Sequence, residues 1–181
     1  MKEYYSRALV LETEEIGEAD LLVHLFTEEY GKIIARARGI RKIKSKSAGH
    51  IQPLRFARVR FVSSRKESSN NYILMDVLWD DDTHTEEHHD FLSLIRVLDV
   101  MTPESQPEPR LWSLLETAFS KPYKPSDVGR VMLQILGHNP QHQVCARCGK
   151  KETKTFVVLE ELFLCAACAS QLPTNTVQLE I

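Results

Sequence analysis

The sequence predicts an α+β protein built from several modules, and three observations carry this prediction. Five short stretches with strand-like alternation fall within about the first 80 residues. Three amphipathic stretches of helical period follow, and all four cysteines then fall in two close pairs. The expected modules are a β-barrel over 1–80, a helical domain over 81–140, a cysteine module over 141–172 and a tail over 173–181.

The first three predicted strands are separated by short turns. Residues 4–13 combine β-favouring aromatics with an aliphatic run, and residues 21–27 alternate between two faces. A tight connection leads into the third strand at 33–38, and Gly31 is predicted to take a positive φ there. His24 on the second strand is interpreted as a sheet residue with a polar tip.

The fourth and fifth predicted strands are residues 54–62 and 71–79. Alternation in the fourth slips near Phe56 and Ala57, which suggests a β-bulge. Five short strands with no long helix among them favour a small closed barrel such as an OB-fold. A five-stranded SH3-like barrel fits the same pattern almost as well.

Basic residues concentrate in one part of the chain. The 181 residues include 23 Lys or Arg and 25 Asp or Glu, yet the window 32–66 holds 12 Lys or Arg and no acid. Residues 1–66 carry a net charge of +6, whereas 67–144 carry −8. This segregation predicts contact with nucleic-acid phosphates, and an ordinary solvated surface is the alternative. The predicted binding residues are Lys32, Arg36, Arg38, Arg41, Lys42, Lys44, Lys46, Arg55, Arg58 and Arg60.

Exposed aromatic side chains beside these cations could stack nucleobases. The candidates are Tyr30, Phe56, Phe61 and Tyr72, although an aromatic residue in a small barrel is more often part of the core. The arginines are therefore the stronger prediction.

The middle of the chain has helical periodicity. Apolar residues recur over 91–101, 111–119 and 128–136, and proline-containing segments separate the three stretches. Ser126 is a candidate N-cap for the third helix. These helices carry no catalytic constellation, so their predicted role is structural.

Two polar clusters before the first helix are given structural interpretations. His84 and His88 have a metal-compatible spacing of four, but such pairs are common by chance at an exposed helix start. Asp80, Asp81 and Asp82 cluster as well, yet no carboxylate lies within the basic window to hold Mg²⁺ beside a phosphate. The sequence therefore predicts a protein that is not an enzyme.

The cysteines follow the spacing C-x₂-C-x₁₆-C-x₂-C. Each C-x₂-C turn directs two sulfurs at one point, and Zn²⁺ takes four such ligands tetrahedrally. Two disulfides are the alternative, which a cytoplasmic chain disfavours. Residues 141–172 are therefore predicted to be a zinc ribbon that holds one structural Zn²⁺, with two short strands within 155–164. The predicted ligands are Cys145, Cys148, Cys165 and Cys168.

The N-terminal residues contain no sustained apolar segment, and no apolar run approaches the ~20 residues of a membrane helix. The expected location is cytoplasmic and associated with the nucleoid, with no membrane partner.

The order of several motifs resembles the RecO family of recombination mediators. The resembling segments are Gly17-Glu18-Ala19-Asp20, Thr27, Gly31-Lys32, Ala37-Arg38-Gly39-Ile40-Arg41, Gly49-His50-Ile51-Gln52-Pro53-Leu54, and later 133–148 and 164–168. Together they cover about residues 1–170, and their order and spacing are more specific than any one of them.

The resemblance implies an OB-fold, a helical domain and a zinc module. It further implies a protein that binds single- and double-stranded DNA, anneals complementary strands and helps load recombinase onto DNA covered by single-strand-binding protein. RecR and the tail of single-strand-binding protein are the implied partners. The family's DNA-binding positives would fall on Lys32, Arg36, Arg38, Arg41, Lys42 and Lys44.

Two further points accompany the resemblance. Family members usually run longer, with more helix after the second cysteine pair, whereas 13 residues follow Cys168 here. The alternative from the residues alone is an RNA-binding OB-fold and zinc-ribbon module of translation or transcription.

Overall fold

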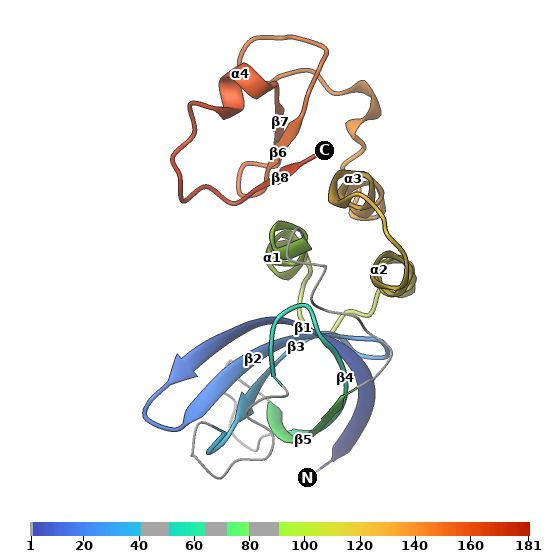
Figure 1. Cartoon of the computed structure of the whole chain (residues 1–181), viewed down its shortest axis with the longest axis vertical. Helices are drawn as coiled ribbons and strands as arrows, with labels where there is room; N and C mark the ends of the chain where they lie inside the picture. The colour runs from blue at the N-terminus through green and yellow to red at the C-terminus, as the bar shows by residue number, and fades with distance from the viewer. Residues whose placement is uncertain (1, 41–50, 64–71, 80–90) are drawn as a thin grey trace.

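A computed structural model describes residues 2–40, 51–63, 72–79 and 91–181. In this part of the chain an N-terminal barrel, a group of helices and a small C-terminal sheet follow one another (Figure 1). Figure 1 shows the helices between the barrel and the C-terminal sheet. The predicted α+β class and its order of modules are confirmed.

The barrel contains β1 (Glu3–Ile16), β2 (Asp20–Thr27), β3 (Gly31–Ala37), β4 (Phe56–Ser63) and β5 (Tyr72–Trp79). These strands close in the order β1-β2-β3-β5-β4. All neighbouring pairs are antiparallel except β3 and β5, which run parallel. This connectivity, with the crossover from β3 to β5, is OB-like. It therefore favours the OB-fold over the SH3-like barrel, which strand periodicity alone could not do.

Small and β-branched side chains fill the barrel interior. Strand β3, for example, turns Ile33, Ala35 and Ala37 inward, and each of the three is at most 2% exposed. The same period of two directs Arg36 outward, where it is exposed. Alternation in the sequence therefore predicted correctly which face of β3 carries charge.

The predicted bulge at Phe56 and Ala57 is wrong. The register of β4 against β1 runs unbroken through both residues, and the β4–β5 register shifts instead between Arg60 and Phe61. Ala57 belongs to the barrel interior, whereas Phe56 belongs to a second core beneath the helices. Alternation is lost there because the strand is buried on both faces.

The three predicted helices are confirmed as α1 (Leu92–Met101), α2 (Pro109–Ser120) and α3 (Pro125–Ile135). The N-cap of α3 is Lys124 rather than the predicted Ser126, and Pro125 occupies the first turn. Proline suits this position because its fixed φ matches the helix and its missing N–H is not needed there. No helix in the described ranges is long and apolar enough to cross a membrane.

The C-terminal module contains η4 (Pro140–His142), β6 (Thr155–Val157), β7 (Leu162–Leu164), α4 (Ala166–Ala169) and β8 (Gln178–Glu180). Its sheet has the order β7-β6-β8, so the two strands predicted within 155–164 are confirmed. The segment predicted only as a tail supplies the third strand.

One apolar core joins all three parts of the chain. It includes Phe56 from the outer face of the barrel, Trp112 from α2, and Phe156 and Leu179 from the C-terminal sheet. The rings of Phe56 and Trp112 lie 5.5 Å apart in an edge-to-face arrangement. The helices therefore pack between the barrel and the C-terminal sheet instead of forming a core of their own.

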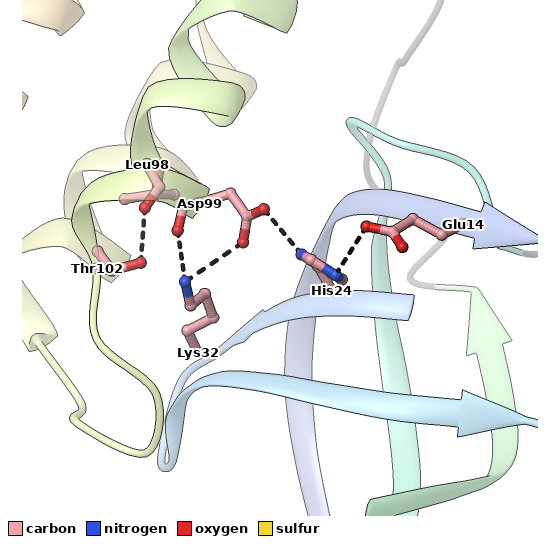
Figure 2. A network of polar contacts seen from close by, with 6 residues as sticks. All are labelled: Glu14, His24, Lys32, Leu98, Asp99 and Thr102. Atoms are coloured by element: carbon pink, nitrogen blue, oxygen red, sulfur yellow. Dashed lines mark hydrogen bonds and ion pairs between the residues drawn. The ribbon is translucent and has the colours of Figure 1, made fainter. Parts of the chain in front are cut away.

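A buried carboxylate reinforces this packing at the junction of the barrel and α1 (Figure 2). Asp99 of α1 is 8% exposed, and its Oδ2 lies 2.8 Å from His24 Nδ1 on β2. Lys32 of β3 places its Nζ 3.6 Å from Asp99 Oδ1 and also donates to the Asp99 backbone carbonyl. On the other side of the imidazole, Glu14 Oε1 lies 3.6 Å from His24 Nε2.

The loop after α1 continues this contact along the start of β3. The Ser105 N–H donates to the Lys32 carbonyl at 2.8 Å. Gly31 has the predicted positive φ of 67°, and a Cβ at this position would overlap the backbone of Gln106. Glycine is therefore needed at residue 31 for its backbone conformation and for the close approach of the loop.

The junction predicts a pH-dependent stability. The hydrogen bond that the His24 imidazole donates to the Asp99 carboxylate raises the pKa of His24, against the opposing effect of burial. Protonated His24 therefore stabilises the fold fully below its unfolded pKa of about 6.5, and this contribution is lost as the pH rises through the higher folded value. We expect Asp99→Asn to lower the unfolding free energy by about 3 kcal/mol at pH 6, because it removes the carboxylate that faces the Lys32 ammonium and protonated His24. The loss should be smaller at pH 8.5, where His24 is neutral.

Urea unfolding at the two pH values measures this difference. Asp127→Asn is the matched control, because Asp127 is an exposed aspartate that pairs with Arg130 on the surface of α3. An Asp99→Asn effect of equal size at both pH values would contradict the role of His24 protonation.

Candidate nucleic-acid interface and cysteine cluster

The first basic surface lies at the end of β3 and the turn that follows. Arg36 and Arg38 are both exposed there. The Arg36 guanidinium pairs with Asp20, with Nη2 at 2.7 Å and Nε at 2.8 Å from Oδ2. The other carboxylate oxygen of Asp20 accepts the Gly39 N–H at 2.7 Å. Asp20 therefore fixes both the arginine and the turn that carries Arg38.

The electrostatics of this surface favour an ionised Asp20. The Gly39 N–H and then the Arg36 guanidinium lower the pKa of the Asp20 carboxyl. The Arg36 side chain remains 46% exposed, so the pair contributes little to stability. A guanidinium has five N–H donors, and the contact with Asp20 leaves donors for a second anion.

Lys32 does not share this surface. Its side chain is only 13% exposed, and its ammonium group faces Asp99 in the junction with α1. The period of two places Lys32 on the same outer face as Arg36, but α1 and its loop cover that part of the face. The sequence carries no local sign of this cover, because Asp99 lies far along the chain.

Arg58 and Arg60 lie on a second surface, the outer face of β1, β4 and β5. Arg58 stands opposite Arg7 of β1, and Arg60 stands opposite Tyr5. Strand β5 separates this face from β3, so Arg36 and Arg38 lie on a different surface from Arg58 and Arg60. Arg55 is partly buried just before β4.

Several sequence-predicted residues lie outside the described ranges. They are Arg41, Lys42, Lys44 and Lys46 of the basic window, together with Asp80, Asp81, Asp82, His84 and His88 before α1.

The aromatic candidates either belong to the apolar cores or pack against them. Phe56 and Phe61 are at most 1% exposed, and Tyr30 and Tyr72 pack edge-on against Phe61 at 5.7 and 5.2 Å. Tyr5, which the sequence argument did not single out, is 62% exposed. Its outward position follows from the alternation of β1, because Ala8 and Val10 face inward and Tyr5 has the opposite parity.

The four cysteines come together at one point in the C-terminal module. Their sulfur atoms all lie within 4.8 Å of one another, and Cys148 Sγ is 3.6 Å from Cys165 Sγ. None of the four forms a disulfide. Each pair sits on a tight turn: the Gly149 N–H donates to the Cys145 carbonyl at 2.8 Å, and the Cys168 N–H to the Cys165 carbonyl at 3.0 Å.

This arrangement fits a tetrahedral metal ion. Zn–S bonds of about 2.3 Å place neighbouring sulfurs about 3.8 Å apart in a tetrahedron. Backbone N–H groups, first that of Cys165, lower the pKa of the Cys145 thiol to about 6. Burial and the adjacent thiols raise the pKa of Cys168 to about 12. A central cation would let all four sulfurs ionise together, because it offsets their mutual repulsion.

The barrel, the helices and the cysteine cluster together define a multi-module OB-fold protein. The family described as "Recombination protein O N terminal" matches residues 1–74, which include nearly all of the barrel. The chain belongs to the RecO family.

Three relatives named "DNA repair protein RecO" illustrate the match. The protein of Syntrophomonas wolfei is 31% identical over 92% of this chain and 70% of its own length. That of Thermodesulfovibrio yellowstonii is 28% identical over 92% of this chain and 70% of its own length. That of Desulfitobacterium hafniense is 29% identical over 82% and 57%. The chain thus spans between 57% and 70% of the length of these relatives.

Proposed function

We propose that this chain binds single- and double-stranded DNA without sequence specificity, anneals complementary strands and assists recombinase loading, with no catalytic residue of its own. The observation that carries the proposal is the exposed pair Arg36 and Arg38 at the end of β3. They belong to a 12-cation window without acids, in a chain whose relatives are named DNA repair proteins.

Charge accounts for binding of this kind. Arginine guanidinium groups bind phosphate oxygens bidentately, and each neutralised phosphate releases condensed counterions. The donors that Arg36 keeps beyond Asp20, and the exposed side chain of Arg38, suit this contact. Annealing needs no chemistry beyond this, because cationic side chains reduce the repulsion between two strands and base pairing completes the reaction.

RecR and the tail of single-strand-binding protein are proposed partners on family membership alone. The RNA-binding alternative shares the same physical basis, since an OB-fold accepts either nucleic acid. Family membership favours DNA, and competition between DNA and RNA oligomers of one sequence would distinguish the two.

The proposed function predicts that charge reversal at Arg36 and Arg38 weakens DNA binding. We expect Arg36→Glu/Arg38→Glu to lower affinity for single strands more than about tenfold, since two charge-assisted contacts are lost. The slope of log K against log salt should become shallower by about 1.4, at roughly 0.7 per phosphate on a single strand. Fluorescence anisotropy at several salt concentrations measures both quantities.

Arg110→Glu/Arg130→Glu is the matched control for this experiment. Both arginines are exposed outside the barrel, Arg110 on α2 and Arg130 on α3, and the double reversal changes net charge equally. Equal losses in the two double variants would mean that only net charge matters, which would contradict the β3 surface as the binding site.

We also propose that Cys145, Cys148, Cys165 and Cys168 hold one structural Zn²⁺. The sulfur separations support this proposal, and four sulfur ligands leave no coordination position for water. The metal would set the two turns that position β6 and β7.

Metal removal should therefore melt the C-terminal module. Because Phe156 and Leu179 belong to the core shared with the helices, we expect a chelator to lower the melting temperature of the helices as well. Circular dichroism with and without chelator measures the change, and elemental analysis should find one zinc per chain. A chain without zinc that melts at the same temperature would refute the metal site.

A further inference from the structure

An open groove of about 440 Å³ lies on the outer face of β1, β4 and β5, where neither Arg36 nor Arg38 contributes. Its size is within the range of clefts that hold small organic ligands. The residues that line it are Tyr5, Ser6, Arg7, Glu29, Arg58, Val59, Arg60, Asp76 and Leu78.

The apolar part of the groove is unusually exposed for a barrel surface. Tyr5 is 62% exposed and Leu78 is 61% exposed, although both are large hydrophobic side chains. The Tyr5 hydroxyl donates to Glu3 Oε2 at 2.9 Å, which restrains the ring. A restrained, exposed aromatic ring is a suitable platform for a nucleobase.

The charged part of the groove is mixed. On the neighbouring strand β5, Leu78 stands opposite Arg58 and Asp76 stands opposite Arg60. The Arg60 Nη1 atom lies 3.7 Å from Glu3 Oε1. The Arg60 guanidinium carries five N–H donors, so its contact with Glu3 leaves donors for a phosphate. The carboxylates of Glu29 and Asp76 also line the groove. Their negative charge disfavours a ligand that presents phosphates alone.

A lining of this mixed chemistry suits a single strand better than a duplex. A duplex presents phosphates outward and keeps its bases stacked, whereas a single strand offers base faces, amino edges and phosphates together. Apolar rings match base faces, carboxylates accept from amino groups such as cytosine N4, and arginines match phosphates.

We propose that this groove binds unstacked bases of single-stranded DNA, with Tyr5 as the stacking platform and Arg58 and Arg60 on the flanking phosphates. The inference rests on the proposed DNA-binding function and adds to it a site selective for single strands. Strand β5 separates this site from Arg36 and Arg38, so the two surfaces can be tested separately.

The test compares a single strand with a blunt duplex of the same length by fluorescence anisotropy. Tyr5→Ala should weaken single-strand binding about five- to 150-fold, the range of one lost stacking contact, and change duplex binding less than twofold. Tyr5→Phe keeps the ring and should retain single-strand affinity. Tyr123→Ala is the matched control, because Tyr123 is 45% exposed outside the barrel.

Three outcomes would overturn the groove proposal. They are single-strand affinity of Tyr5→Ala within twofold of wild type, an equal loss for duplex, and an equal loss in Tyr123→Ala. If Arg36→Glu/Arg38→Glu still weakens binding in the first case, the proposed function stands without the groove. If neither variant changes binding, both surfaces are wrong as binding sites, and if the wild-type chain binds neither strand nor duplex, the DNA-binding function itself fails.

Photocrosslinking gives a second readout that does not depend on a variant. A single strand containing 5-iodouracil should crosslink to wild-type Tyr5 and be detected by mass spectrometry of the digested chain. Crosslinks confined to other residues would contradict the proposal even if Tyr5→Ala lost affinity by unfolding.

Discussion

The contact of Asp99 with two barrel strands is the constraint on which the arrangement of the modules depends. A carboxylate that is 8% exposed needs cationic or hydrogen-bonding partners, and His24 and Lys32 supply them from β2 and β3. These partners fix where α1 lies on the barrel and which apolar side chains it covers. The same contact removes Lys32 from the basic surface, so a junction between modules decides which cations remain available to a ligand.

Among the described residues, cations that are close in the sequence do not all lie on one surface of the fold. The strand order places β5 between β3 and β4, so Arg36 and Arg58 face different directions although both belong to the basic window. Acidic partners differ as well: Asp20 holds Arg36 in a surface pair, whereas Glu29 and Asp76 share a groove with Arg58. The described cations of the window therefore lie on two surfaces of different chemistry, one of which also carries exposed apolar side chains.

Sequence patterns predicted the features that depend on nearby residues. The strands, the three helical periods, the positive φ of Gly31 and the meeting of the cysteines all follow from local spacing. Predictions that depend on distant contacts were wrong: the bulge at Phe56 and Ala57 was inferred from a loss of alternation that arises because the helices cover β4. Strand β8 was missed because it is too short to show a period. Lys32 does not belong to the basic surface because it contacts Asp99, 67 residues away in the sequence. No local pattern can indicate such a contact.

The shared core gives the cysteine cluster an effect beyond its own module. The rings of Phe156 on β6 and Phe163 on β7 lie 4.9 Å apart in a tilted arrangement, and both belong to the core that contains Trp112 of α2 and Phe56 of the barrel. The first cysteine turn contacts these strands directly, because the Ala146 N–H donates to the Phe163 carbonyl of β7 at 3.0 Å. A change in the cluster would thus alter the packing of the helices against the barrel, and through α1 it would reach the contacts of Asp99 with His24 and Lys32. A structural metal and a buried carboxylate would therefore stabilise one continuous arrangement from its two ends.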